Sequence, residues 1–138
     1  MGKASGIPAP LPACPCGAGA YAQCCGRFHV GALPQSAEQL MRSRYSAYVL
    51  GLTDYVHRTW HPSTRPAREE LQEDAGTRWL GLEVKKHAAT GDDAAMVEFV
   101  ARSKSGGRAQ RMHEKSRFVR EGGQWFYVDG SFPEDKKQ

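Results

Sequence analysis

The chain has 138 residues, of which 40% are hydrophobic, and its 19 Lys and Arg against 15 Asp and Glu give a formal net charge of +4. This length fits one domain with a small appendage, and it is enough to bury a real core. No stretch approaches the roughly 18 apolar residues of a membrane helix, and no continuous apolar run follows Lys3 as in a secretory signal. We therefore expect a cytoplasmic protein with no membrane contact. The modest charge does not by itself indicate nucleic-acid binding.

All the cysteines of the chain lie in one short stretch, CPCGAGAYAQCCG, at residues 14–26. A structural zinc ion takes four ligands in a tetrahedron, and thiolates are among those it prefers. Gly17 and Gly19 allow the tight loop that would bring the two cysteine pairs together. The segment has few large apolar side chains, and metal binding would supply the folding free energy that it lacks. The candidate ligands are Cys14, Cys16, Cys24 and Cys25.

Other chemistries of four thiols are alternatives to zinc. A reducing cytoplasm disfavours a disulfide pair. A thioredoxin-like redox centre needs C-x-x-C at the start of a helix, whereas the first pair here is C-x-C, and the spacing matches no ferredoxin run. The pattern therefore favours zinc as the cofactor. His29 follows Cys25 by four residues and is an alternative fourth ligand, the competing interpretation being a partly exposed loop histidine.

Residues 14–26 resemble the SEC-C motif, the small zinc module at the carboxyl end of the SecA translocation ATPase, whose pattern is close to C-P-C-G-S-G-x-x-Y/F-x-x-C-C/H-G. The resemblance implies that the same four cysteines bind zinc. Two departures concern the loop between the pairs. Ala18 stands where the motif usually has Ser, and the loop is one residue shorter than in the common pattern.

Further stretches along the chain are similar to the YchJ family, a largely uncharacterised bacterial group. They lie at residues 40–66, 78–84, 97–102 and 113–130. The resemblance implies an N-terminal zinc motif followed by a nuclear-transport-factor-2-like domain. The expected organisation is a disordered tail at 1–13, a zinc motif at 14–29, the larger domain at 34–131 and a tail at 132–138.

The first half of the larger domain has the pattern of helices. Apolar residues between Ser36 and Gly51 recur with a period near 3.6, and these two residues fit an N-cap and a C-terminal stop. A second short helix is expected at 53–59, before the prolines of the HPSTRP loop, and a third at 67–74.

The second half has the pattern of strands. Runs at 78–88, 94–104, 110–121 and 124–130 alternate, and turn residues separate them. The first run predicts a face shared by Leu80, Leu82 and Val84, and Gly122-Gly123 predicts a hairpin turn. The fold class is therefore α+β, with helices packed on a curved antiparallel sheet. The family resemblance implies a cystatin-like, nuclear-transport-factor-2-like cone.

No catalytic constellation is recognisable in the sequence, so no catalytic residue is predicted and the chain is not expected to be an enzyme. The alternative function is a small-ligand binder or an enzyme that uses the cone pocket, and polar residues on otherwise apolar elements are the candidates to line it. The alternative for these residues is a structural ion pair or packing. The candidate pocket residues are Arg44, Trp60, His61, Arg102 and Glu114.

Residues 102–120 form a basic stretch, with seven Lys or Arg and Glu114 as the single acid. It predicts either a solvated edge protected by charge or a contact with RNA or the ribosome. The primary hypothesis is a zinc-binding adaptor for a protein partner. By resemblance to the SecA module, that partner would be an export chaperone such as SecB, or the ribosome.

Overall fold

The computed structural model describes residues 13–71 and 76–133 of the chain. Its elements are the 3₁₀ helix η1 (Tyr21–Gln23), helices α1 (Cys25–His29), α2 (Ala37–Leu50) and α3 (Thr53–Arg58), the 3₁₀ helix η2 (Arg68–Glu70), and strands β1 (Thr77–Gly91), β2 (Ala94–Ser105), β3 (Arg108–Glu121) and β4 (Gln124–Ser131). The predicted tails lie almost wholly outside the described residues. So does the second half of the helix expected at 67–74, whose described part is a single 3₁₀ turn.

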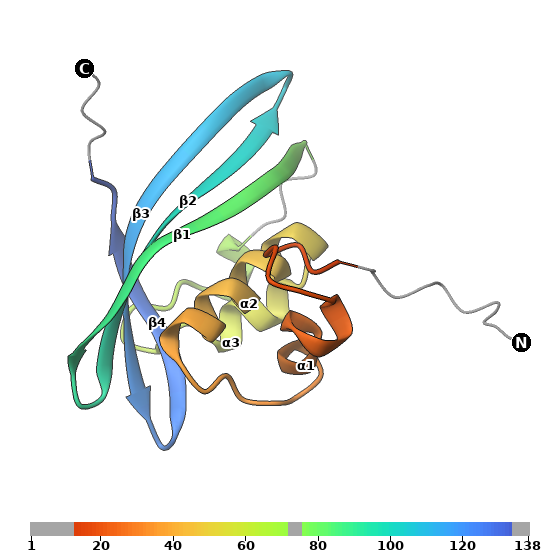
Figure 1. The fold of residues 1–138 in the computed structure, drawn as a ribbon. Coiled ribbons are helices and arrows are strands. Elements are labelled where there is room, and N and C mark those ends of the chain that lie inside the picture. Colours follow the sequence, from red (N-terminus) through yellow and green to blue (C-terminus); the bar gives the residue numbers. More distant parts are fainter. Residues whose placement is uncertain (1–12, 72–75, 134–138) are drawn as a thin grey trace, which may run out of the picture.

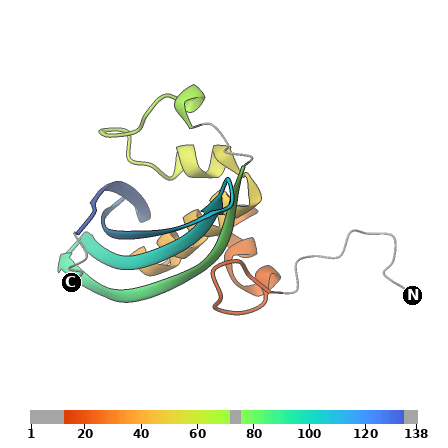
Figure 2. The same ribbon diagram turned by 90° about the horizontal axis from the view of Figure 1, so that it is seen from above.

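The four strands form one antiparallel sheet in the order β1-β2-β3-β4, so each strand pairs with the next along the chain. The sheet is strongly curved, and α2 and α3 lie on its concave side (Figures 1 and 2). The α+β prediction is confirmed. None of the helices in the described part of the chain is long and apolar enough to span a bilayer.

Helix α2 begins and ends where its capping residues predict. The Ser36 Oγ accepts a hydrogen bond from the Gln39 amide at 3.1 Å, which satisfies a free donor of the first turn. Gly51 ends the helix in the left-handed conformation, with φ of 74°, which glycine adopts without the steric cost of a Cβ. Leu40, Met41 and Tyr45 are buried in the main core, so this helix is the element on which the concave face of the sheet closes.

Strand β1 departs from the predicted alternation. Its pairing with β2 shifts between Trp79 and Gly81, and Leu80 between them is 54% exposed. Trp79, Leu82 and Val84 pack against the core instead. The predicted face of Leu80, Leu82 and Val84 is therefore wrong for Leu80, because an extra residue in a strand reverses the side on which its neighbours point.

The segment after α3 runs along the outer edge of β4. Trp60 forms an isolated parallel bridge with Tyr127. The His61 amide donates to the Tyr127 carbonyl at 2.7 Å, and the Tyr127 amide donates to the Thr59 carbonyl at 2.9 Å. The Thr64 Oγ1 adds a bond to the Val128 carbonyl at 2.6 Å. These contacts fix the end of α3 against the sheet, although the HPSTRP loop has no regular structure.

Candidate metal centre and cone cavity

The cysteine knuckle, residues 14–29, brings all four thiols of the chain together. The Sγ atoms of these cysteines lie within 4.8 Å of one another, and every one of the thiols is free. The Cys16 and Cys24 Sγ atoms are 3.6 Å apart, far longer than the bond of about 2.05 Å in a disulfide. This arrangement could hold a metal ion at the centre of the cluster.

Backbone turns at glycines make the approach of the sulfurs possible. The Gly17 amide donates to the Cys14 carbonyl at 2.9 Å, and Gly17 has φ of +88°, a conformation that favours glycine. Gly26 lies where the two turns of the knuckle meet. A Cβ at this position would lie 2.7 Å from the Tyr21 carbonyl oxygen, so a larger residue would force η1 and α1 to shift relative to each other.

The electrostatics of the cluster also suit a cation. A hydrogen bond from the Cys25 thiol lowers the pKa of Cys16 to about 4, and the same bond, together with burial, raises the pKa of Cys25. Burial raises the pKa of Cys24 to about 11. Ionising one thiol therefore makes its neighbours harder to ionise. A divalent cation removes this conflict because it stabilises every thiolate at once.

The knuckle packs on the side of helix α2 that faces away from the sheet (Figure 1). The Cys14 Sγ lies 3.4 Å from the Ser46 Oγ, and the Arg42 Nη1 donates to the Cys16 carbonyl at 3.1 Å. Cys14, Cys16 and Cys25 are buried and belong to the same core cluster as the apolar face of α2. The knuckle and the cone therefore share one helix and one core.

His29 lies between the knuckle and α2. Its Nδ1 lies 2.6 Å from the Tyr21 hydroxyl and its Nε2 lies 2.9 Å from the Ser43 carbonyl, and its ring packs edge-on against Tyr55. The neutral tautomer with the proton on Nε2 satisfies both contacts. Burial lowers the pKa of His29, which favours this neutral form. With both nitrogens engaged, His29 lies outside the group of sulfurs and bridges the knuckle to α2.

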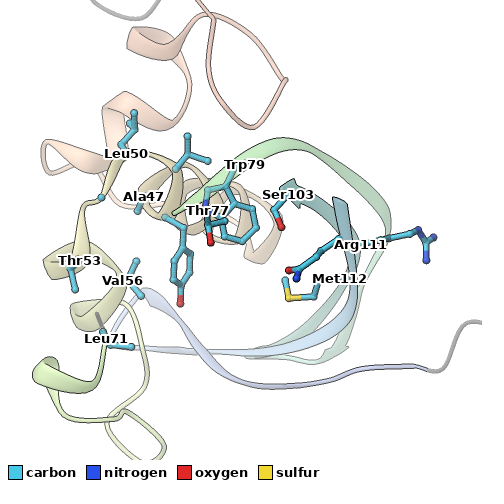
Figure 3. Close-up of a pocket in the computed structure, with 14 residues that line it drawn as sticks. Ala47, Leu50, Thr53, Val56, Leu71, Thr77, Trp79, Ser103, Arg111 and Met112 are labelled. Atoms are coloured by element: carbon cyan, nitrogen blue, oxygen red, sulfur yellow. The ribbon is translucent and has the colours of Figure 1, made fainter. Parts of the chain in front are cut away.

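The cone contains a cavity of about 270 Å³ between α2 and the concave face of the sheet. Its lining is mostly aromatic, with two charged side chains. The lining residues are Met41, Arg44, Tyr45, Tyr48, Trp60, Trp79, Phe99, Ala101, Met112, Glu114, Phe118 and Tyr127. A wider outer cavity of about 690 Å³ shares Tyr48, Trp79 and Met112 with it. Figure 3 shows this outer cavity, where Trp79 and Met112 of the sheet face Ala47 and Val56 of the helices.

The structure brings Arg44, Trp60 and Glu114 together at the inner cavity, and it places the other two candidate pocket residues elsewhere. Arg102 is exposed, with its Nη1 3.9 Å from Glu83, because it alternates along β2 with the residues that face the cavity. The His61 Nε2 lies 3.0 Å from Glu121, outside the cone.

Sequence reasoning missed the polar neighbours of Glu114. Its Oε2 accepts hydrogen bonds from the Ser116 hydroxyl at 2.7 Å and from the Tyr127 hydroxyl at 3.0 Å. The signal for Ser116 was available, since residues two apart on a strand share a face. Tyr127 offered none, because in the run QWFYVDG it is indistinguishable from a core aromatic. The carboxylate also contacts the position that a Cβ of Gly130 would take, so a glycine is needed opposite it.

The basic stretch at 102–120 is partly neutralised within the sheet. Arg117 makes two bonds of 2.7 Å to Asp129, and Arg120 lies 2.9 Å from Asp93. With Arg102 beside Glu83, three of its seven basic residues face a carboxylate of another strand or turn within residues 13–71 and 76–133. These pairs support the interpretation of a solvated, charge-protected surface.

The fold and the cysteine cluster define a class of protein: a nuclear-transport-factor-2-like domain preceded by a SEC-C-type cysteine motif. The family described as "YchJ, middle NTF2-like domain" matches residues 36–130. The chain belongs to this family, which confirms the resemblance seen in the sequence.

Similar sequences and similar solved structures point to the same family and fold. A UPF0225 protein of Ralstonia nicotianae is 60% identical, over 94% of this chain and 98% of its own length. Another, of Methylibium petroleiphilum, is 64% identical, over 88% and 89%. The solution structure of a SEC-C motif containing protein from Rhodopseudomonas palustris has a TM-score of 0.75 at 33% identity, covering 88% of this chain and 99% of that one. A crystal structure of a SEC-C motif containing protein from Psychrobacter arcticus gives 0.73 at 29% identity, covering 94% and 87%.

Proposed function

We propose that the chain is a zinc-binding protein-interaction module, in which one Zn²⁺ fixes the cysteine knuckle on helix α2. The observation that carries the proposal is the convergence of the four Sγ atoms within 4.8 Å. Four thiolates fill the tetrahedron of a structural zinc ion, whereas catalytic zinc keeps one position open for water or substrate. The burial of three of the four cysteines also suits a structural ion.

The metal is tested by elemental analysis of the purified chain, with about one zinc per chain as the expected result. Cys24→Ser and Cys25→Ser should each lower the metal content and the affinity. His29→Gln is the matched control and should leave the stoichiometry unchanged, because the ring contacts Tyr21 and Ser43 and not the sulfurs. Iron with the visible absorbance of a cluster, or a chain that takes up no metal, would contradict the proposal.

The interaction surface is proposed on the outer side of the knuckle. The loop that joins α1 to α2 exposes two large apolar side chains, Val30 at 87% and Leu33 at 48%. Apolar side chains exposed on the loop that directly follows the knuckle suit contact with a protein. The resemblance of residues 14–26 to the SecA module supports a cytoplasmic partner in export or nascent-chain handling, such as the SecB chaperone or the ribosome.

This partner is tested separately from the metal. Binding of purified SecB and of purified ribosomes is measured with the zinc-loaded chain, with Cys24→Ser and with Val30→Asp. Binding that both variants lose supports the proposed surface. If the zinc-loaded chain binds neither, the partner assignment fails while the zinc site stands.

A further inference from the structure

The buried side chain of Arg44 lines the inner cavity of the cone, and only some of its hydrogen-bond donors have an acceptor among the described residues. Arg44 is 6% exposed, and its Nη1 donates to the Val56 carbonyl at 2.8 Å and to the Thr59 Oγ1 at 2.7 Å. Its guanidinium lies over the rings of Tyr127, at 4.4 Å, and Trp60, at 5.1 Å. Among residues 13–71 and 76–133, no hydrogen bond from Nε or Nη2 and no carboxylate within 4.0 Å is found. These donors are therefore available to a molecule in the cavity.

The buried carboxylate of Glu114 also lines this cavity, and only one of its two oxygens accepts hydrogen bonds from the described residues. Glu114 is 7% exposed, and both of its bonds, from Ser116 and Tyr127, go to Oε2. Oε1 has no donor among the described residues. The cavity thus offers one cationic donor and one anionic acceptor that are not directly paired with each other.

A third polar group of the lining has no partner. The Trp60 indole N–H is buried and lacks an acceptor within the described part of the chain. A buried N–H without a partner costs about 1–3 kcal/mol, so such groups are uncommon in protein cores. The Trp125 indole N–H, outside the cavity lining, is also buried without a partner among the described residues, so the indication of a binding site comes from Arg44 and Glu114, two charged groups that converge on a mostly apolar cavity.

The charges limit the class of molecule that fits. An organic anion would satisfy Arg44 but leave a net negative charge beside Glu114, and an organic cation would leave a net positive charge beside Arg44. Either excess is costly in a site of low dielectric constant. A neutral group that accepts from Arg44 and donates to Glu114 satisfies both. A carboxamide, or the equivalent N–H and C=O of a heteroaromatic ring, carries both functions on neighbouring atoms.

The size and the walls of the cavity limit the shape. Its volume of about 270 Å³ equals that of about nine water molecules at ~30 Å³ each, which suits a single aromatic ring with a small substituent. Seven of the twelve lining residues are aromatic, and they favour a flat ring through stacking and edge contacts.

We propose that the inner cavity is a binding site for a small, flat, uncharged aromatic or heteroaromatic molecule with adjacent hydrogen-bond acceptor and donor atoms, of which Arg44 takes the acceptor and Glu114 the donor. The site lies on the opposite side of α2 from the cysteines, and it does not depend on the metal or the partner proposed above. It rests on the inner cavity alone.

The test compares three ring compounds of nearly the same size and different charge: neutral benzamide, anionic benzoate and cationic benzamidine. Each is titrated into the zinc-loaded chain while the backbone amide signals are followed by nuclear magnetic resonance. We expect benzamide to bind in about the millimolar range, as suits a ligand of this size, and at least about fivefold more tightly than either charged compound. Shifts should centre on α2 and β3. Equal or tighter binding of benzoate or benzamidine overturns the proposal, as does the absence of binding by all three.

Two variants distinguish polar recognition of the ligand from nonspecific occupation of the cavity. Glu114→Gln removes the negative charge and should reverse the preference, so that benzoate binds more tightly than benzamide. An unchanged preference in a folded Glu114→Gln variant overturns the assigned role of the carboxylate. Ala101→Leu places a larger side chain in the cavity and should abolish binding of all three compounds while the chain stays folded. Arg102→Gln, on the other face of β2, is the matched control and should leave every affinity unchanged.

Discussion

The cysteine knuckle and the cone are built on the same helix by different physical means. The knuckle, residues 14–29, buries Phe28 as its single large apolar side chain, and its other buried side chains are thiols. The cone surrounds α2 with apolar residues from every strand of the sheet. Under the proposed function, order in the knuckle depends on a metal ion held by its thiols, whereas order in the cone depends on the burial of apolar surface. This difference predicts that the two regions respond to different perturbations.

The largest expected effect is removal of the metal. Cys14→Ser combined with Cys25→Ser should remove metal binding, which for structural zinc sites is on the order of 10 kcal/mol. We expect the amide signals of residues 14–29 to broaden or disperse poorly, while those of β2 and β3 remain. Hydrogen exchange followed by nuclear magnetic resonance measures this. Complete unfolding of the sheet would show that the cone depends on the metal too, and that the contrast between the regions is false.

The opposite perturbation removes a large side chain from the apolar core of the cone. Phe118 is 1% exposed in the main core, and Phe118→Ala should lower the free energy of unfolding by about 3–5 kcal/mol. Denaturation in urea measures the loss. The zinc content of the variant, measured below its melting temperature, should stay at one ion per chain. A variant that remains folded but loses its zinc would contradict the separation of the two regions.

A smaller effect is expected from strain within the knuckle. Gly26→Ala would place a Cβ 2.7 Å from the Tyr21 carbonyl oxygen, and such overpacking usually costs about 1–3 kcal/mol. The cost should appear as weaker metal binding in competition with a chelator. Gly81→Ala, where a Cβ would meet nothing within 4 Å, is the control and should leave the metal affinity unchanged.

The smallest effect concerns pH at the junction of the two regions. Burial lowers the pKa of His29, so the folded state binds this proton less readily than the unfolded state does. Stability should therefore fall as the pH drops below about 6.5, the ordinary histidine value, and continue to fall down to the lowered folded pKa. His29→Gln should flatten this slope in urea denaturation between about pH 7.5 and pH 5.5. Zinc content is measured at each pH, because acid also releases metal from thiolates.

Much of the architecture was predictable because it rests on local chemistry. Ser36 and Gly51 fix the ends of α2 through capping geometry that involves only neighbouring residues. Gly122-Gly123 fixes the β3–β4 turn for the same reason, since both residues have positive φ. The cysteines were recognisable as a group because they are close in sequence as well as in space.

The remainder depended on contacts between distant residues. The bulge that exposes Leu80 leaves no mark in the alternation of β1. Arg44 and Arg102 both interrupt apolar patterns, yet only the structure shows that Arg44 faces the cavity and Arg102 the solvent. The spacing of four residues from Cys25 makes His29 a candidate ligand in the sequence. Its contact with the Ser43 carbonyl, across the knuckle–helix junction, has no counterpart in the sequence pattern.

The segment that runs beside β4 also bears on how the protein behaves at high concentration. An outer strand with free amide and carbonyl groups can recruit a strand from another molecule and start aggregation. On β4, the bonds from His61 and Thr64 and the bridge at Trp60 occupy part of that edge. On β1, the other outer strand, the pairing with β2 shifts at three places, one of them between Val84 and Lys86, and Lys85 and Lys86 add charge, so this edge is irregular and charged. Both outer strands are therefore poor templates for strand addition, and the curved sheet can keep a hollow interior without an exposed, self-associating rim.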